Sequence, residues 1–236
     1  MALRDDILSD TQTIISTLWN KRRGRQVPNT SDVALAGGAV EIEATFLYAD
    51  LADSSKMAKQ LDRRIAAKIF KSFLATSARL IRAHGGEVRS FDGDRIMGVF
   101  VGGYRNTSAV KCALQIKWCV GKIRAKFEAK YESVRDASFR IRHGVGVDSG
   151  TVLSVRGGAR GSNDLIWIGR APNLAAKLSD LRESPYSTFI TAAVFNRLND
   201  EGKYGDTEKS LMWERRTWNF LAENLVVYRS SWHWRP

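Results

Sequence analysis

A β-hairpin in the middle of the chain narrows the range of possible folds before any other pattern does. Residues 87–92 and 95–101 are two strand-like runs, and Asp92 and Gly93 stand where the runs meet. An Asp-Gly pair between two such runs is the strongest short-range signal of a tight hairpin turn. The sequence therefore predicts a hairpin with Asp94 at its tip or just past it.

Helix-like and strand-like patterns flank this hairpin on both sides. Apolar and polar side chains alternate from Val40 to Tyr48, which predicts a strand ending near Asp50. The other predicted elements are a helix over 65–80, a long helix over 107–130, a second hairpin over 139–155, a short buried strand over 165–168, a helix over 172–178, and C-terminal strands over 189–191 and 211–234 with one more helix between them. The order β-α-β-β-α-β predicts an α+β, ferredoxin-like domain with a mainly antiparallel sheet and helices on one face.

The N-terminal segment differs in pattern from the rest of the chain. Residues 5–20 carry apolar side chains at helical spacing, and residues 21–28 break that spacing with charge, Gly and Pro. We expect residues 1–32 to be a helix and linker, followed by one catalytic domain over 33–236, since 236 residues suit a single domain with additions. The helix would pack on its own domain or on a second subunit.

Composition excludes several classes of protein. The formal net charge is +12, which suits a polyanionic partner, either a nucleic acid or a triphosphate, although the basic residues are spread along the chain. We find no apolar run long enough for a membrane span and no secretion signal, so we expect a cytoplasmic protein without membrane insertion. Cys112 and Cys119 lie on one helix and are expected to pack as small hydrophobic groups, and most of the seven Trp residues should be in the core or a subunit interface.

Two aspartates stand at the ends of neighbouring strands. Asp50 follows the first strand and Asp94 lies at the hairpin tip, so two carboxylates could share divalent ions such as Mg²⁺ or Mn²⁺. A backbone carbonyl, such as that of Leu51, could complete the ligand set with phosphate oxygens. Each aspartate taken alone would equally suit a turn or a helix cap. Asp148, further along, is expected only to cap a turn.

Four stretches together resemble one family. Residues 46–55, 85–100, 142–152 and 168–178 are similar, in the same order, to the motifs of the class III nucleotidyl cyclase catalytic domain. The resemblance implies a phosphorus–oxygen lyase that makes a 3′,5′-cyclic nucleotide and pyrophosphate from a nucleoside triphosphate. The ribose 3′-hydroxyl would attack the α-phosphate in line with the help of two divalent ions per site, Mn²⁺ or Mg²⁺.

The resemblance also implies roles for individual positions. Asp50 and Asp94 match the two metal-binding aspartates of the family, and Leu51 matches the position that lends a backbone carbonyl. The stretch from Phe46 to Leu51 matches the one whose backbone lies along the triphosphate.

Two further matches lie in the predicted helix over 172–178. Asn173 matches the residue that orients the ribose, and Lys177 stands where the family usually has an Arg that stabilises charge on the phosphates. Lysine keeps the charge and loses the planar fork of donors. In the family these two residues come from the opposite subunit, so the resemblance implies a homodimer with two shared active sites.

The positions that read the base in purine cyclases are occupied by Ser90 and Ile166. Ile166 cannot form a hydrogen bond with a purine edge, and an unpaired amino group in a closed pocket costs about 1 to 3 kcal/mol. Arg89, Ser90, Tyr48 or Asp92 could meet the smaller ring of a pyrimidine. We therefore expect a pyrimidine nucleotide, and UTP rather than CTP, while a cytidylate, adenylate or guanylate cyclase remains the alternative.

The short build and the altered base positions resemble the pyrimidine cyclases of the bacterial anti-phage system Pycsar. That resemblance implies cyclic UMP as a second messenger in antiviral defence, with a separate effector that responds to it. The nature of the activating signal is left open.

A nucleic-acid-binding module is the rival interpretation, since the same β-α-β-β-α-β layout serves RNA recognition. RNA-binding sheets expose aromatic side chains on their central strands, whereas these strands end in Asp50, Asp92 and Asp94. Carboxylates repel phosphate unless a metal ion is present. We therefore expect a triphosphate substrate and no nucleic-acid partner.

Overall fold

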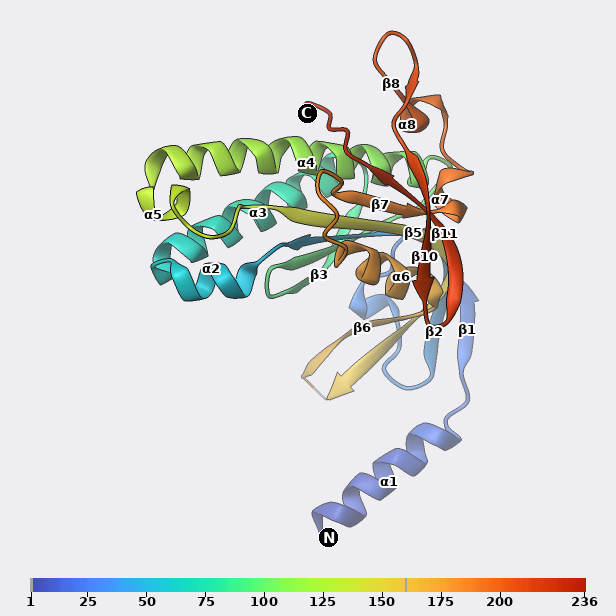
Figure 1. The fold of residues 1–236 in the computed structure, drawn as a ribbon. Coiled ribbons are helices and arrows are strands. Elements are labelled where there is room, and N and C mark those ends of the chain that lie inside the picture. The colour runs from blue at the N-terminus through green and yellow to red at the C-terminus, as the bar shows by residue number, and fades with distance from the viewer. Residues whose placement is uncertain (1, 160) are drawn as a thin grey trace.

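A computed structural model describes residues 2–159 and 161–236 of the chain (Figure 1). Its elements, in chain order, are α1 (Leu3–Ser16), β1 (Asn20–Arg23), the 3₁₀ turn η1 (Thr30–Asp32), β2 (Gly38–Leu51), α2 (Ser54–Gln60), α3 (Arg63–Ala83), β3 (Glu87–Asp92), β4 (Arg95–Phe100), α4 (Arg105–Lys130), α5 (Glu132–Arg135), β5 (His143–Ala159), β6 (Ser162–Ile168), α6 (Arg170–Ser179), β7 (Thr188–Thr191), α7 (Ala192–Phe195), α8 (Asp200–Lys203), β8 (Tyr204–Gly205), β9 (Ser210–Leu211), β10 (Glu214–Phe220) and β11 (Glu223–Ser230).

A mainly antiparallel sheet forms the centre of the molecule. Its strands lie in the order β10-β11-β7-β5-β2-β4-β3, with β1 paired to β2 and β6 paired to β5. The pairs β1–β2 and β5–β7 are parallel, and the other pairs of this sheet are antiparallel. This arrangement confirms the predicted α+β class.

Helices cover both faces of the sheet. Residues Leu47, Ala49 and Leu51 of β2 pack into the larger core cluster with α3 and α4, while Ala44 and Phe46 pack into a second cluster with α6. This split follows from the two-residue period of a strand, which sends successive side chains to opposite faces. The prediction of helices on one face only is therefore wrong, because α6 lies against the other face.

The central hairpin is confirmed as β3 and β4. Gly93 lies in the turn with φ of +58°, a left-handed backbone conformation that glycine adopts without strain. Asp50 of β2 lies directly opposite Arg95, the first residue of β4. The hairpin tip is therefore held beside the end of β2.

The second predicted hairpin is not at residues 139–155. Residues 143–159 form one long strand, β5, and its outer part pairs antiparallel with β6. Gly144 and Gly146 lie inside β5 where α6 approaches closely: a Cβ on Gly146 would lie 2.0 Å from the Ala175 carbonyl oxygen. Glycines in a strand predict either a tight turn or a close backbone approach, and the second role is the one that Gly144 and Gly146 have here.

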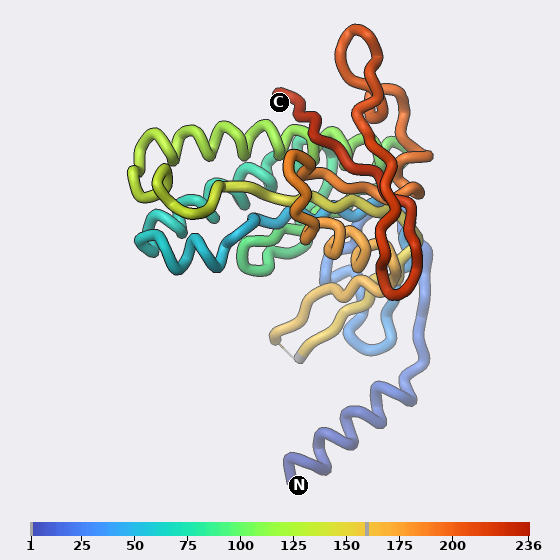
Figure 2. Tube along the Cα trace, viewed as in Figure 1, coloured from blue at the N-terminus to red at the C-terminus, as the bar shows by residue number. Residues whose placement is uncertain are grey.

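Strand β6 is more exposed than predicted. Ile166 is 49% exposed and Ile168 is 54% exposed. The strand pairs with the outer part of β5, beside the main path of the sheet, and of its side chains Trp167 packs against the cluster that contains Phe46. In Figures 1 and 2, β6 and the outer end of β5 project together from the body.

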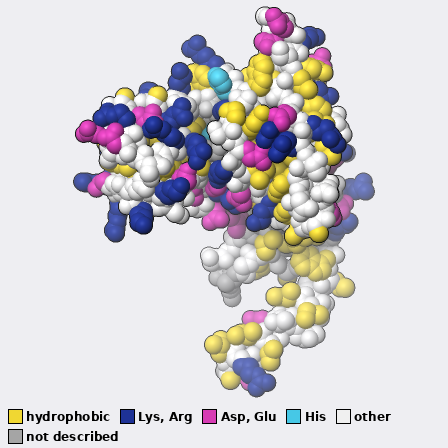
Figure 3. Space-filling model, viewed as in Figure 1, with side chains coloured by type: hydrophobic (Ala, Val, Ile, Leu, Met, Phe, Trp, Pro, Cys, Tyr) yellow, Lys and Arg dark blue, Asp and Glu magenta, His cyan; other side chains and the backbone are white. Residues whose placement is uncertain are grey.

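The N-terminal helix projects away from the body (Figures 1 and 2) and buries none of its residues. Hydrophobic side chains gather on it, and Lys and Arg are scattered over the visible face of the body among Asp and Glu (Figure 3). Strand β1 lies in the segment predicted as helix and linker, and it attaches that segment to β2.

Among the residues that the structure describes, no helix is long and apolar enough to cross a membrane.

The packing predicted for the two Cys residues and for one Trp is confirmed. Cys112 is a free, fully buried thiol and Cys119 is a free, half-buried one. Trp213 is buried, and its Nε1 donates to the Gly202 carbonyl at 2.8 Å. The segment before β10 contains two short helices, α7 and α8, where one was predicted.

Candidate active site

The Asp50 carboxylate lies at the end of β2 and is 8% exposed. It sits between Arg95 of β4 and Gly144 of β5 in the ladder. Asp94 immediately precedes Arg95 at the hairpin tip, close enough for its charge to act on Asp50. The structure thus brings together the two aspartates whose proximity was predicted from neighbouring strand ends.

Burial raises the pKa of Asp50, and the charge of Asp94 raises it further, while Arg95 and Arg182 act in the opposite direction. The net change is an increase from the ordinary value of an aspartate. A partly dehydrated carboxylate beside a second carboxylate is a favourable environment for a cation, because a cation offsets both causes of the raised pKa.

Two arginines form ion pairs with the Asp50 carboxylate. Arg95 Nε lies 3.4 Å from Oδ1, and Arg182 Nη2 lies 2.6 Å from Oδ2. Arg95 also forms an ion pair with Asp180 at the end of α6. Neither arginine was among the site residues predicted from the sequence. Arg95 could have been found, because it follows Asp94 in the hairpin, whereas Arg182 comes from the loop after α6 and carries no local signal.

The chemistry of this cluster fits a hard divalent cation. Mg²⁺ and Mn²⁺ prefer oxygen ligands, and Mg²⁺ usually takes only one or two protein carboxylates. Among the described residues no group of three or more His, Cys, Asp and Glu could hold a metal ion, so the other ligands would be carbonyl, water or phosphate oxygens. Leu51 is 2% exposed and its side chain is in the core, which leaves only its backbone for such a role.

Phe46 and Tyr48 lie on the same face of β2 as Asp50, at two-residue intervals. The Phe46 side chain is fully buried, with its ring edge-on to Trp167 at 5.5 Å between centroids, so only its backbone is available to a ligand. Tyr48 is half-buried. Burial raises its pKa, with Arg95 acting against that change and Asp92 adding to it, which places Tyr48 beside the hairpin.

Ser90 and Ile166 lie on separate strands. Ser90 is half-buried in β3 opposite Met97, next to an irregularity in the β3–β4 ladder. Ile166 lies on β6 and packs over Gly157, where a Cβ would stand 2.2 Å from Ile166 Cδ1. Strands β3 and β6 do not pair with each other, so Ser90 and Ile166 are not neighbours in the sheet of one chain.

Asn173 and Lys177 are both exposed and lie one helical turn apart on α6. Asn173 Nδ2 donates to the Gly169 carbonyl at 3.2 Å. Both residues line a cavity of about 540 Å³ between α6 and the β10–β11 turn. Within the described part of the chain, no hydrogen bond or ion pair connects them to Asp50 or Asp94. The predicted site residues therefore form two separate groups.

Asp148 is not a turn cap. It lies within β5, is 4% exposed, and accepts a hydrogen bond from the Thr191 hydroxyl of β7. Burial raises its pKa. Asp148 thus connects two neighbouring strands in the interior.

Curated proteins similar to this chain over its whole length are uridylate cyclases. One from Rhodovulum sp. (strain MB263) is 57% identical over 236 residues, covering 100% of this chain and 98% of the relative. Uridylate cyclases from Xanthomonas perforans and Burkholderia cepacia are 40% and 38% identical over 237 residues, with at least 99% of each chain covered. No protein-family model matches the chain.

Solved structures with the same fold are cyclase domains. The guanylyl cyclase Cya2 superposes with a TM-score of 0.68 at 17% identity, covering 83% of this chain and 95% of that one. The adenylyl cyclase CyaB from P. aeruginosa gives a TM-score of 0.67 at 16% identity, covering 81% and 95%. At these identities the likeness concerns the fold.

Proposed function

The chain belongs to the uridylate cyclase family, and we propose that it converts UTP to 3′,5′-cyclic UMP and pyrophosphate. The observation that carries this proposal is the juxtaposition of Asp50 and Asp94 at the ends of β2 and β3–β4, in a chain related to uridylate cyclases over its full length. The class III cyclase fold, shared with the solved structures, supports the same reaction type.

Asp50, Asp94 and the backbone carbonyl of Leu51 would hold two divalent ions, Mn²⁺ or Mg²⁺. When bound, such ions neutralise phosphate charge and lower the pKa of the ribose 3′-hydroxyl. Arg95 and Arg182 contribute through Asp50, since their charges oppose the rise in its pKa and favour the ionised carboxylate. The reaction needs no protein nucleophile, because the attacking hydroxyl and the leaving pyrophosphate both belong to the substrate.

Asn173 and Lys177 would act on a substrate held by the aspartates of a second subunit. Their exposure and their separation from Asp50 within one chain support a homodimer with shared sites. Asn173 would orient the ribose through its amide. Lys177 would place a positive charge near the phosphates, without the bidentate geometry that an arginine provides.

Selectivity for a pyrimidine is supported by Ile166, which is apolar and 49% exposed. It offers no hydrogen bond to a purine edge, whereas the hydroxyls of Ser90 and Tyr48 are half-buried and polar. From the resemblance to Pycsar cyclases, we propose that cyclic UMP acts as a second messenger in anti-phage defence through a separate effector.

The test is a product assay with each of ATP, GTP, CTP and UTP, first with Mn²⁺ and then with Mg²⁺, with products identified by mass. We expect cyclic UMP from UTP and its loss in Asp50→Asn and Asp94→Asn. Asp136→Asn is the control. Asp136 is exposed and is not among the proposed site residues, so this variant should retain activity. Cyclic product from ATP or GTP alone would contradict the pyrimidine assignment, and no product from any triphosphate would contradict the cyclase assignment.

A further inference from the structure

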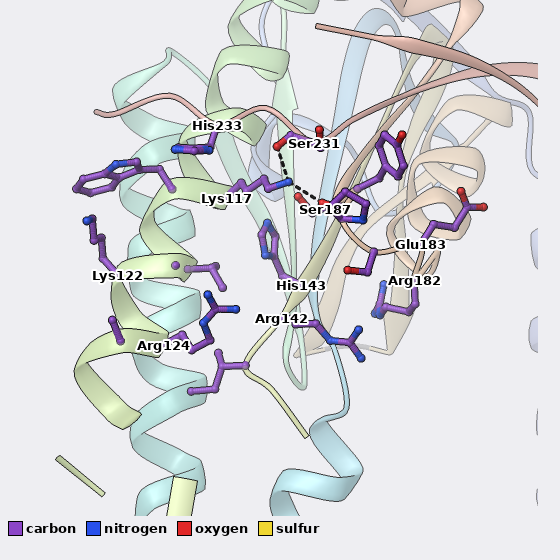
Figure 4. Close-up of a pocket in the computed structure, with 18 residues that line it drawn as sticks. Lys117, Lys122, Arg124, Arg142, His143, Arg182, Glu183, Ser187, Ser231 and His233 are labelled. Atoms are coloured by element: carbon purple, nitrogen blue, oxygen red, sulfur yellow. Dashed lines mark hydrogen bonds between the residues drawn. The ribbon is translucent and has the colours of Figure 1, made fainter. Parts of the chain in front are cut away.

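A cavity of about 600 Å³ lies behind the catalytic strand ends (Figure 4). It is enclosed by α4, the start of β5, the loop over 182–187 and the C-terminal tail. His143 pairs with Leu51, and directly opposed residues point to the same face of a sheet. Leu51 faces the α3–α4 core, so the His143 side of the cavity is on the opposite face from Asp50.

The lining is strongly cationic. The basic side chains are those of Lys117, Lys122, Arg124, Arg142 and Arg182. Glu183 is the one acid among the lining residues that the structure describes, and it is already paired with Arg229. Within the described part of the chain, Lys117, Lys122 and Arg124 have no carboxylate partner within 4 Å. Positive charge in the cavity is therefore left without a counter-ion.

Lys117 is built into the wall of the cavity. Its Nζ donates to the carbonyls of Pro185 at 2.8 Å and Ser231 at 2.7 Å, as the dashed lines in Figure 4 show. Burial lowers its pKa to about 8, so the ammonium group is still mostly charged at neutral pH. An ammonium group has three donors, and two carbonyls use two of them, which leaves one for a ligand.

Two buried polar atoms beside Lys117 have no partner among the residues that the structure describes. They are His143 Nε2 and Ser187 Oγ, and each residue is 7% exposed. Figure 4 shows the His143 ring and Ser187 close to the Lys117 ammonium group at the wall of the cavity. Buried polar groups are normally hydrogen-bonded, and a specific unpaired group calls for an explanation such as a missing ligand or water.

The cavity suits an anion with several oxygen acceptors. Cationic side chains of α4 line it, together with Arg142 just before β5, which is paired with Asp53, and the Trp118 ring and Pro185 add an apolar wall. Its volume lies in the range of small-molecule sites. Phosphate oxygens accept charge-assisted hydrogen bonds from several cations at once.

We propose that this cavity binds a small phosphate monoester, and that the bound phosphate competes with Asp50 for Arg182. Arg182 lines the cavity and also reaches the Asp50 carboxylate at 2.6 Å. A phosphate that attracts the Arg182 guanidinium removes a cation from Asp50 and leaves that carboxylate available to a metal ion. This second part rests on the proposed role of Asp50, whereas the binding site itself does not.

Binding is tested by calorimetry on the full-length protein with ribose 5-phosphate as the probe and ribose as its uncharged control. We expect ribose 5-phosphate to bind and ribose not to bind. Arg124→Gln and Lys117→Gln should each weaken binding about tenfold, since each removes a charge-assisted contact. Lys126→Gln, an exposed lysine on the same helix outside the cavity, should change the Kd less than about twofold. Lys117 also supports two carbonyls, so Arg124→Gln keeps the test valid if the Lys117 variant is unstable.

The coupling is tested by titrating Mn²⁺ and measuring the free ion by electron paramagnetic resonance, with and without ribose 5-phosphate. We expect the probe to strengthen Mn²⁺ binding in the unmodified protein and in Lys126→Gln, with little effect in Arg124→Gln. Absence of ribose 5-phosphate binding, or equal binding by all variants, would overturn the site. Binding without any change in Mn²⁺ affinity would overturn the coupling to Arg182. Because neither readout requires turnover of UTP, a failed cyclase assay would leave the phosphate site standing.

Discussion

Arg182 Nη2 lies 2.6 Å from Asp50 Oδ2, although the two residues are 132 positions apart in the chain. The contact connects the loop after α6 to the end of β2. If Asp50 binds a metal ion as proposed, the ion and Arg182 compete for the same carboxylate, so a change at Arg182 is expected to act on Asp50.

Complementation between two inactive variants tests the shared site. In a shared site, Asp50 of one subunit acts together with Lys177 of the other. A heterodimer of an Asp50→Asn subunit and a Lys177→Ala subunit therefore keeps one of its two sites intact. An equal mixture that exchanges subunits freely should regain about a quarter of the unmodified activity, because half of the dimers are mixed and each has one good site. A mixture of Asp50→Asn and Asp94→Asn should regain no activity, because one subunit supplies both aspartates of a site and each site would lack one of them. Equal recovery in both mixtures would contradict a shared site. The measurement is the rate of cyclic UMP formation.

Removal of the Arg182 charge should shift the pH dependence of the reaction. Arg182 lowers the pKa of Asp50, so Arg182→Gln should raise that pKa and move the acidic limb of the rate profile to higher pH. Arg215→Gln, an exposed change on β10, should leave the profile in place. The profile is measured as kcat/KM for UTP against pH. An unchanged acidic limb in Arg182→Gln would contradict a titration of Asp50 controlled by Arg182.

His143 should make the fold sensitive to acid. Burial, together with the charges of Lys117 and Arg182, lowers the pKa of His143 to about 3. Because the unfolded chain takes up this proton near pH 6.5 and the folded chain only near pH 3, stability is lost as pH falls through this window, by up to about 1.4 kcal/mol per pH unit. His143→Asn should reduce that slope, as measured by urea unfolding at several pH values. His233→Asn, at an exposed position, should not, and equal slopes in both variants would refute the assignment.

Two truncations should separate the roles of the N-terminal segment. Deletion of residues 2–16 removes only α1, which buries no residue, and should leave the melting temperature unchanged. Deletion of residues 1–28 also removes β1 and Val27, which is 5% exposed in the core beside α6, and should lower the melting temperature by about 5 °C. Equal melting temperatures would contradict this assignment. Mass measured in solution tests whether α1 holds two subunits together, and an unchanged dimer without α1 would exclude that role.

Local patterns predicted the parts of the fold that local chemistry determines. Asp92 and Gly93 mark a turn by themselves, and a turn fixes which residues of its two strands are opposed. The turn places Asp94 beside the first residue of β4, and its proximity to Asp50 then required only that β4 lie next to the strand that ends near Asp50. The packing of Cys112 and the burial of Trp213 likewise follow from side-chain chemistry.

Features that depend on distant contacts could not be predicted in this way. Gly144 and Gly146 left a tight turn and a close backbone approach both open, because the choice depends on α6 lying against β5. The exposure of Ile166 depends on the position of β6 beside the sheet. Arg182 reaches Asp50 only after the chain has passed through β5, β6 and α6, and no spacing in the sequence shows that path.

The parallel pairing of β1 with β2 has a mechanical consequence. Strand β1 is hydrogen-bonded along residues 38–41, the first residues of the same strand that ends at Asp50. Tension applied to the projecting helix α1 would therefore pass through β1 into β2, the strand that carries Asp50 near its far end. A partner bound to α1 would thus transmit force to the proposed active site through a single continuous strand.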